Sequence, residues 1–89
     1  MAAYRHARLV VFGRKGCHLC DAVEVEIRSI EGTETSVTVV DIEKDPALLE
    51  RYLWRIPVVT LAGKEVFEAD MMDPNGSWKE RLRSVLKAS

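Results

Sequence analysis

The sequence lacks an apolar segment of the kind that inserts into membranes. Its longest candidate for a membrane or signal segment is the four-residue run Leu9–Phe12. A secretory signal requires an apolar stretch of about 7–15 residues, and a membrane-spanning helix requires about 20. We therefore expect a cytoplasmic protein whose work does not involve a membrane.

The sequence also lacks a dominant charge, internal repeats and low-complexity tracts. Its 13 basic and 14 acidic residues give a formal net charge of −1. This balance provides no field that would attract nucleic acid or an anionic membrane, so neither is an expected partner. With 89 residues and 47% hydrophobic composition, the chain predicts a single domain over residues 1–89, in which residues 1–6 are expected to be flexible.

Cysteine is scarce, and both copies lie in one segment, GRKGCHLCDA, as Cys17 and Cys20. A reducing cytoplasm disfavours structural disulfides, and a bridge between residues three apart closes too short a loop to add much stability. Chemistry is the favoured explanation, as a redox pair or as half of a metal site. A closed zinc site needs about four ligands, and only His18 and the distant His6 are available, so such a site would need a second chain.

Hydrophobic patterning places the cysteines where a strand is followed by a helix. The run Leu9–Phe12 is typical of a strand buried on both faces, and Gly13 ends it. From Cys17 the apolar spacing becomes helical, which predicts a helix that ends at Gly32. The buried face of this helix would consist of Leu19, Val23, Ile27 and Ile30.

A second strand and a second helix follow. The run from Val37 to Ile42 is rich in β-branched residues, which favours a strand. A strand, a helix and a strand in this order form a βαβ unit with parallel strands and a right-handed crossover. Asp45 can cap the next helix, and Pro46 fits its first turn, where a missing N–H group is harmless.

The remainder of the chain predicts a hairpin and a final helix. Residues 57–61 and 64–67 read as strands around a tight turn at Ala62–Gly63. Ser77 and Glu80 form a capping box that would start the last helix. The order β-α-β-α-β-β-α predicts an α/β fold with a four-stranded mixed sheet flanked by helices.

The start of the first helix would make the two thiols unequal. The free N–H groups of the opening turn and the positive end of the helix dipole favour a thiolate at Cys17. The pKa of a free cysteine is about 8.5, and such positions lower it. Cys20 lies one turn further into the helix, where fewer free donors reach it. We therefore predict that Cys17 is the attacking nucleophile and that Cys20 is the resolving thiol.

Two charged neighbours of Cys17 are candidates for tuning its thiolate. Lys15 and His18 lie close in sequence, and a positive charge on either side chain favours the thiolate. A protonated His18 would also make the disulfide more oxidising. The alternative for His18 is an ordinary solvent-facing residue on a helical turn, and the sequence favours neither role over the other.

A strand, the segment GRKGCHLC, a helix, a strand and then RIPVV before a hairpin together resemble the thioredoxin superfamily. The chain is most similar to the small glutaredoxin-like proteins that carry a dithiol C-x-x-C motif, from Leu9 to the final helix. The resemblance implies a thioredoxin-like fold with a cis peptide bond between Ile56 and Pro57, in a loop that faces the cysteines. It also implies that the backbone of Ile56 pairs with an extended substrate segment.

One departure from typical glutaredoxins concerns glutathione. Those proteins carry a Gly-Gly pair after the hairpin, where backbone amides approach the γ-glutamyl end of glutathione, whereas this chain has Phe67–Glu68 there. Asp70 remains a candidate to receive the amino group of glutathione, and Lys15 and Arg55 are candidates to meet its carboxylates. Arg14 is a further candidate for substrate binding. The alternative is that all these charges are simply solvated.

The residues and the resemblance together predict a thiol–disulfide oxidoreductase that acts on protein or small-molecule disulfides. Exchange needs no tightly bound cofactor, but it needs an electron donor, for which glutathione and a flavin reductase are the candidates. Two alternatives stay open: a metal-binding protein, and a non-catalytic module that binds a partner in a groove at Pro57. Met71, Met72 and Trp54 could supply apolar surface for such a partner.

Overall fold

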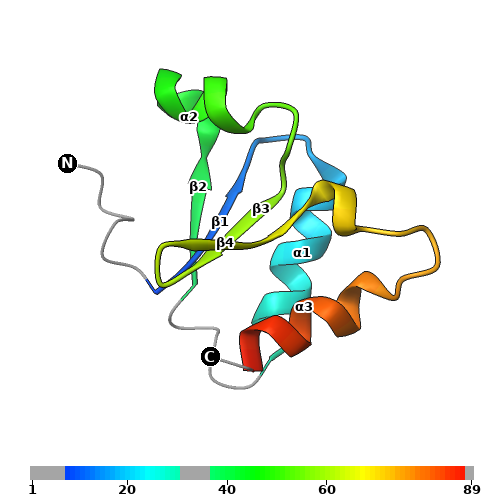
Figure 1. Ribbon diagram of the computed structural model, residues 1–89. Helices are drawn as coiled ribbons and strands as arrows, with labels where there is room; N and C mark the ends of the chain where they lie inside the picture. The colour runs from blue at the N-terminus through cyan, green and yellow to red at the C-terminus, as the bar shows by residue number, and fades with distance from the viewer. Residues whose placement is uncertain (1–7, 31–36, 88–89) are drawn as a thin grey trace.

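The computed structural model describes residues 8–30 and 37–87, so the predicted flexibility of residues 1–6 and the predicted helix stop at Gly32 lie outside the described residues. Figure 1 shows one sheet with helices on both of its faces. The strands are β1 (Leu9–Gly13), β2 (Val37–Asp41), β3 (Val58–Leu61) and β4 (Lys64–Glu68). The helices are α1 (His18–Arg28), α2 (Pro46–Tyr52) and α3 (Trp78–Lys87), with short 3-10 helices η2 (Ile42–Lys44) and η3 (Ala69–Met71).

The sheet is mixed, as the element order predicts, and its strand order is β2-β1-β3-β4. Strand β1 runs parallel to β2, with Leu9 opposite Val37. It runs antiparallel to β3, with Phe12 opposite Val58. The carboxyl end of β1, from which the cysteine segment departs, therefore lies beside the amino end of β3. This α/β arrangement is a thioredoxin-like fold.

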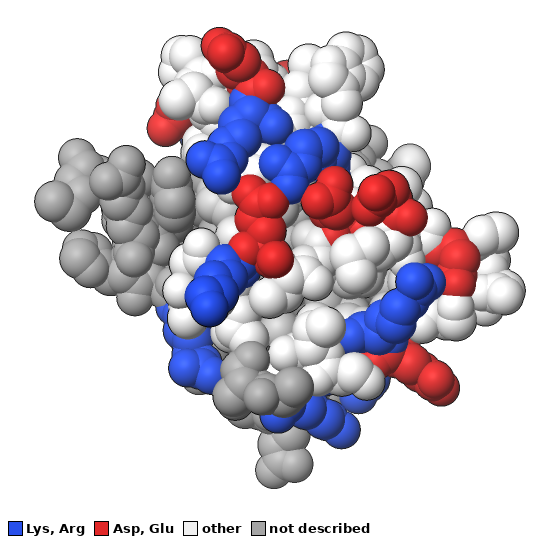
Figure 2. Space-filling model, in the orientation of Figure 1, with Lys and Arg blue, Asp and Glu red and all other residues white. Residues whose placement is uncertain are grey.

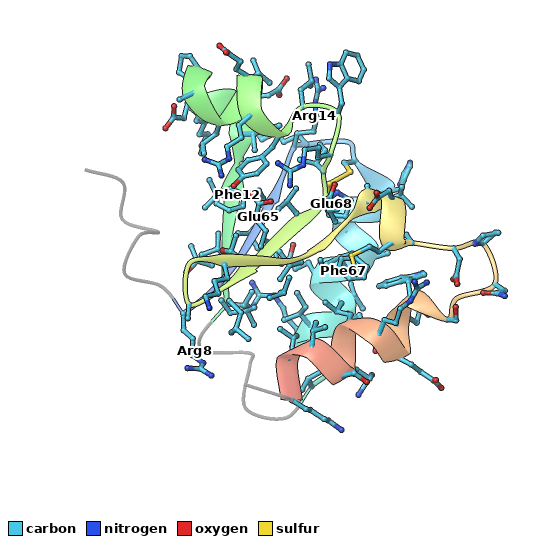
Figure 3. All side chains as sticks on the ribbon, in the orientation of Figure 1. Arg8, Phe12, Arg14, Glu65, Phe67 and Glu68 are labelled. Atoms are coloured by element: carbon cyan, nitrogen blue, oxygen red, sulfur yellow. A yellow bond between two sulfur atoms is a disulfide. The ribbon has the colours of Figure 1, made fainter. Side chains whose placement is uncertain are left out.

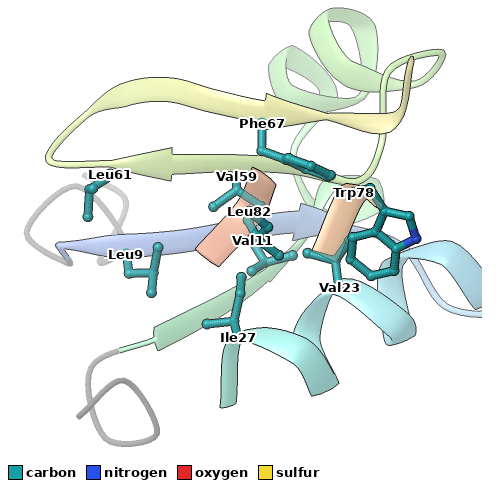
Figure 4. Close-up of a cluster of buried hydrophobic side chains, with 9 residues drawn as sticks. All are labelled: Leu9, Val11, Val23, Ile27, Val59, Leu61, Phe67, Trp78 and Leu82. Atoms are coloured by element: carbon teal, nitrogen blue, oxygen red, sulfur yellow. The ribbon is translucent and has the colours of Figure 1, made fainter. Parts of the chain in front are cut away.

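Successive residues of β1 contribute to two cores on opposite faces of the sheet. Leu9 and Val11 belong to the larger core, which Figure 4 shows between the sheet and helices α1 and α3. Val10 and Phe12 belong to the smaller core beside η2 and α2, where the Phe12 ring stacks on Tyr52. Side chains alternate between the faces of a strand, so a strand that is apolar at every position needs cover on both faces. All of β1 is buried, which confirms that prediction.

Local capping residues mark the end of α1 and the start of α2. Helix α1 ends at Arg28, and Ser29 is its C-cap. Asp45 caps α2 as predicted, because its Oδ1 atom accepts the Ala47 N–H at 2.9 Å. A side-chain oxygen in this position satisfies one of the backbone donors that a helix start leaves unpaired.

The start of α3 differs from the predicted capping box. The Trp78 N–H donates to Asp73 Oδ1 at 3.2 Å, and the Ser77 hydroxyl donates to the same carboxylate. These hydrogen bonds lower the pKa of Asp73, the one from Ser77 having the largest effect. A carboxylate from the preceding loop, and not the hydroxyl of Ser77, thus accepts from the first turn of α3.

The β3–β4 hairpin turns at Ala62 and Gly63, as predicted. Their φ angles are +53° and +85°, and two consecutive positive φ angles are what a type I′ turn requires. This turn matches the twist of the flanking strands and aligns β4 along β3. In the described part of the chain, no helix combines the length and apolar character that crossing a membrane requires.

Candidate active site

Cys17 and Cys20 are joined by a disulfide at the start of α1, visible as the yellow sulfur–sulfur bond in Figure 3. Their Cα atoms are 5.2 Å apart, within the range of about 4.4–6.8 Å that disulfides span. Cys17 is the N-cap of α1, and its Sγ atom accepts the Cys20 N–H at 3.1 Å. A sulfur atom therefore occupies the position where a side-chain oxygen caps most helices.

The two cysteines differ in their access to solvent. Cys20 is only 6% exposed, whereas Cys17 is half-buried. Cys20 packs against the end of β1, where a β-carbon on Gly13 would lie 3.0 Å from both its Cβ and Sγ atoms. Glycine is the residue that permits such a close approach of backbone and side chain. An outer Cys17 and an inner Cys20 are compatible with the roles of nucleophile and resolving thiol.

The strand register brings the segment before β3 to the cysteines. Because Phe12 lies opposite Val58, continuing the antiparallel register by one residue places Gly13 opposite Pro57. The peptide bond between Ile56 and Pro57 is cis, the isomer that the resemblance implies. Pro57 is fully buried, and Ile56 packs against the smaller core. The proline loop and the cysteine segment therefore meet at the same end of the sheet.

The backbone N–H of Ile56 is already used inside the chain. It donates to the Tyr52 carbonyl at 3.1 Å, and the N–H of Arg55 donates to the same oxygen at 2.8 Å. On the other side of the loop, the Arg55 carbonyl accepts the Ala69 N–H at 3.1 Å. Pairing of Ile56 with an extended substrate segment can therefore use its carbonyl oxygen but not its amide.

Arg55 is held by the acidic residues of β4. Its guanidinium donates to Glu68 at 3.0 Å, also contacts Glu65, and lies over the Tyr52 ring, 5.3 Å from the ring centroid. The hydrogen bonds to Glu68 and Glu65 raise the pKa of Arg55, and the bond from Arg55 lowers the pKa of Glu65. Burial, followed by a hydrogen bond to Glu65, raises the pKa of Tyr52. Figure 2 shows the resulting mixture of blue and red side chains on this face.

Of the remaining charged candidates, Arg14 is also paired within the chain, with Glu43 at 2.7 Å. Lys15 and His18 are exposed on the two sides of the first cysteine. Across residues 8–30 and 37–87, no ion pair involves Lys15. Asp70 is exposed in η3, which follows β4 directly. The structure thus gathers these residues around one end of the sheet, but it leaves the two arginines already paired.

The position of the Gly-Gly pair of typical glutaredoxins is filled in this chain. Phe67 is buried in the larger core, and Figure 3 shows it beneath Glu68 on the same strand. Glu68 pairs with Val58 across the β3–β4 ladder and binds Arg55 through its side chain. A core aromatic residue and an ion-paired carboxylate therefore occupy the place where glycine amides would approach glutathione.

Several contributors to this site were not predicted from the sequence. Gly13 was identified as a strand end, although a glycine placed just before a C-x-x-C segment is itself a signal of close packing. Tyr52 and Glu65 lie 13 residues apart, and their contact depends on the tertiary fold. Within the described residues, no group of three or more His, Cys, Asp or Glu side chains is arranged to hold a metal ion.

The fold and the helix-capping C-x-x-C disulfide are those of the thioredoxin superfamily. Oxidised thioredoxin from Plasmodium falciparum, known from a solution structure, shares the fold at 16% identity and a TM-score of 0.54, covering 94% of this chain and 83% of that one. Residues 8–87 match the family model described as Glutaredoxin-like domain (DUF836), so the chain belongs to this glutaredoxin-like family.

An X-ray structure of a protein of this size is also similar. The structural genomics target protein XcR50 from X. campestris is 29% identical, with a TM-score of 0.65, and the match covers 91% of this chain and 97% of that one. A search of curated proteins found no match. These comparisons give the family and the fold, and they indicate a redox-type protein without specifying a substrate.

Proposed function

We propose that this protein is a thiol–disulfide oxidoreductase in which Cys17 is the nucleophile and Cys20 is the resolving thiol. The observation that carries this proposal is the asymmetry of the pair: Cys17 is accessible at the helix start and Cys20 is buried behind it. The Cys20 N–H that reaches Cys17 Sγ would stabilise a thiolate in the reduced protein. Helix-terminal donors thus favour the reactive form of the outer residue.

The proposed reaction is a two-electron exchange in two steps. The Cys17 thiolate attacks one sulfur of a substrate disulfide, forming a mixed disulfide and releasing the first substrate sulfur as a thiolate that takes up a proton. The Cys20 thiol loses its proton and attacks Cys17 Sγ, which releases the second substrate sulfur. The substrate gains two electrons and two protons, and the protein ends with the Cys17–Cys20 disulfide seen in the structure.

Return to the dithiol requires a donor of two electrons. Glutathione and a flavin reductase are the two candidates that we propose, and neither needs a tightly bound cofactor on this chain. Within the same proposal, Lys15 and His18 tune the Cys17 thiolate from the two exposed positions beside it. We propose the cytoplasm as the compartment, since reversible cysteine pairs there serve catalysis or redox sensing and seldom structure.

The proposal is tested by equilibrating the protein over a series of glutathione redox ratios, quenching with an alkylating reagent and weighing the intact chain. We expect both thiols to disappear together across a narrow range of ratios, which defines the reduction potential. His18→Ala and Lys15→Ala should each shift this midpoint if the two residues tune the pair. Alkylation of both thiols at every ratio would contradict the redox proposal.

Two variants assign the individual roles. Cys20→Ser should form a stable mixed disulfide with a small substrate disulfide because the resolving thiol is absent. Cys17→Ser should form none, since the remaining thiol is buried. Rapid alkylation of the reduced wild-type protein should label Cys17 before Cys20, and the thiolate absorbance should give Cys17 a pKa below about 8.5. The opposite labelling order would reverse the assignment.

A further inference from the structure

Trp54 is an apolar side chain that the fold leaves outside its core. It is 91% exposed, whereas the other tryptophan, Trp78, is buried in the larger core. A tryptophan buries a large apolar area when it finds a partner, so an exposed one marks a candidate contact site. The fold itself offers no reason for an indole at this position, because Trp54 belongs to neither buried core cluster.

The turn that carries Trp54 is fixed on both sides. Before it, the Leu53 N–H donates to the Leu49 carbonyl at 3.0 Å, which continues α2. After it, Arg55 binds Glu68 through its side chain and Ala69 through its carbonyl. The backbone that carries Trp54 therefore has a defined path, so binding through the indole requires little ordering of the chain.

Trp54 lies at the end of the sheet where exchange would occur. It precedes Ile56 by two residues, and the β1–β3 register sets the Ile56–Pro57 segment opposite the start of the cysteine loop. Leu19, between the two cysteines, is 52% exposed on the first turn of α1, so the prediction that it belongs to the buried face of this helix is wrong. Cys20 takes the buried position of this turn. Two exposed apolar side chains are therefore carried by the two segments that meet at the disulfide.

Several polar groups at this end of the sheet are already engaged within the chain, whereas Trp54 and Leu19 are exposed. The guanidiniums of Arg14 and Arg55 are already bound to carboxylates of the chain. The N–H of Ile56 is bound to Tyr52, so backbone pairing with a substrate is reduced to one carbonyl. Of the charges predicted to meet glutathione, Lys15 and Asp70 are exposed, whereas Arg55 is ion-paired and Phe67–Glu68 fill the position of the Gly-Gly pair. The exposed side chains of Trp54 and Leu19 add apolar surface that a polypeptide can cover and that glutathione, which has no large apolar group, cannot.

We propose that Trp54 and Leu19 determine substrate specificity by contacting a bulky apolar side chain next to the reactive cysteine of a polypeptide disulfide. This inference rests on the proposed exchange function and names its substrate class. The polypeptide sulfur reaches Cys17, its backbone donates to the Ile56 carbonyl, and its apolar side chain covers the indole. Neither contact changes the chemistry of the thiols, so small disulfides react without them.

The test measures the second-order rate constant for reduction of a disulfide by the pre-reduced protein, which requires no electron donor. Three substrates are compared: a peptide homodimer linked through one cysteine with leucine beside it, the same homodimer with serine in place of leucine, and hydroxyethyl disulfide. Symmetrical disulfides make the choice of attacked sulfur irrelevant. We expect the wild-type protein to prefer the leucine peptide to the serine peptide.

Trp54→Ala should lower the rate constant for the leucine peptide roughly tenfold, the effect of losing about 1.4 kcal/mol of apolar contact. The rate constants for hydroxyethyl disulfide and the serine peptide should stay within about twofold of wild type. Leu19→Ala should have a smaller effect in the same direction, and Trp54→Phe should restore most of the preference. Val25→Ala is the matched control, because Val25 is exposed on α1 but lies about two turns beyond Cys17.

The outcomes separate the two proposals. If the wild-type protein does not reduce even hydroxyethyl disulfide, the exchange function fails. If it reduces hydroxyethyl disulfide but Trp54→Ala reduces both peptides as fast as wild type does, the specificity proposal is overturned. Uniform slowing of all three substrates would also overturn it, since that pattern indicates a structural effect. Oxidised glutathione is measured as a further substrate, and a faster reaction with it than with the leucine peptide would overturn the polypeptide substrate class in favour of glutathione.

A binding measurement on the same variant set checks the contact directly. Tryptophan emission of the Cys20→Ser protein, linked through Cys17 to the leucine peptide, should shift to the blue, because the indole of Trp54 leaves water. The adduct with the serine peptide should show little shift, and the Trp54→Ala protein should show none with either peptide. If the leucine adduct emits at the same wavelength as the Cys20→Ser protein without peptide, the proposed contact is contradicted.

Discussion

The three α-helices in the described part of the chain begin in two different ways. Helices α2 and α3 are capped by carboxylates, with Asp45 accepting from Ala47 at 2.9 Å and Asp73 accepting from Trp78 at 3.2 Å. Helix α1 is capped by sulfur, with Cys17 accepting from Cys20 at 3.1 Å. The backbone donors are the same in each case, and the acceptor differs in chemistry.

This difference shows how one structural device can be reused for chemistry. A carboxylate cap is charged in both redox states and only stabilises its helix. A sulfur cap is neutral in the disulfide and carries charge in the thiolate, so the same N–H donors stabilise the reduced form more. The start of α1 therefore couples helix capping to redox state, whereas the starts of α2 and α3 do not.

The largest effect should come from replacing the sulfur cap. Cys17→Ser and Cys17→Asp both keep an oxygen that can cap α1, but neither can form a mixed disulfide, so exchange should fall to the uncatalysed rate. Cys17→Asp should nevertheless unfold at higher denaturant concentration than Cys17→Ala, since it has the cap of α2. Exchange is measured with hydroxyethyl disulfide and stability by urea titration. Equal stability of the Asp and Ala variants would contradict the idea that a carboxylate at position 17 caps α1 as Asp45 caps α2.

The next largest effect should come from replacing Gly13, which packs against the buried Cys20. Gly13→Ala would place a β-carbon 3.0 Å from Cys20 Cβ and Sγ, which predicts a loss of about 1–3 kcal/mol in the free energy of unfolding. Urea titration measures this loss. In a Cys20→Ala background the penalty should shrink because Sγ is absent, and a double-mutant cycle gives the coupling. An unchanged penalty there would place the strain elsewhere.

A smaller effect is expected at the carboxylate cap of α2. Asp45→Ala removes the acceptor of the Ala47 N–H and should lower the free energy of unfolding by about 1 kcal/mol. The reduction potential of the cysteine pair should not change, because α2 packs on the opposite face of the sheet from α1. Asp45→Asn, which keeps a capping oxygen, is the matched control. A shifted potential in Asp45→Ala would mean that the two helix starts are coupled.

The smallest effect should be a difference in pH dependence between the carboxylate cap of α3 and the sulfur cap of α1. The pKa of Asp73 is lowered in the folded protein, chiefly by the Ser77 hydroxyl, so its contribution is fully present above the ordinary aspartate pKa. That contribution is lost as the pH falls through the lowered value. The protection of the Trp78 amide against hydrogen exchange, relative to its intrinsic exchange rate, should therefore fall as the pH is lowered. The protection of the same amide in the Asp73→Asn variant should not change with pH, because the amide side chain does not titrate. The Cys20 amide of the oxidised protein should show no such change, because its disulfide acceptor does not titrate.

The sequence predicted those parts of the fold that depend on local pattern. The apolar run in β1, the Asp45–Pro46 helix start and the Ala62–Gly63 turn each carry their signal within a few residues. The order of elements then restricted the sheet to a mixed arrangement with a parallel β1–β2 pair. The family resemblance added the proline loop, which no local pattern would have placed beside the cysteines.

What the sequence did not predict depends on contacts between distant residues. The partners of Arg55 are Glu65 and Glu68 on β4, and their approach follows from the strand register. The cap of α3 is Asp73, because the loop before the helix folds back onto its first turn. The amide of Ile56 is occupied because the chain leaves α2 in a tight turn. Single-residue patterns contain no information about such geometry.

The anchoring of the turn around Trp54 has a consequence for how this chain can diverge. Leu53 continues α2 and Arg55 binds β4, so the path of the backbone through position 54 does not depend on the side chain there. Mutations at an exposed position of this kind are close to neutral for stability. Position 54 is thus open to drift and selection while the cysteines and the fold stay constant. Under the proposed role of Trp54, one substitution at position 54 would change the preferred disulfides without destabilising the fold.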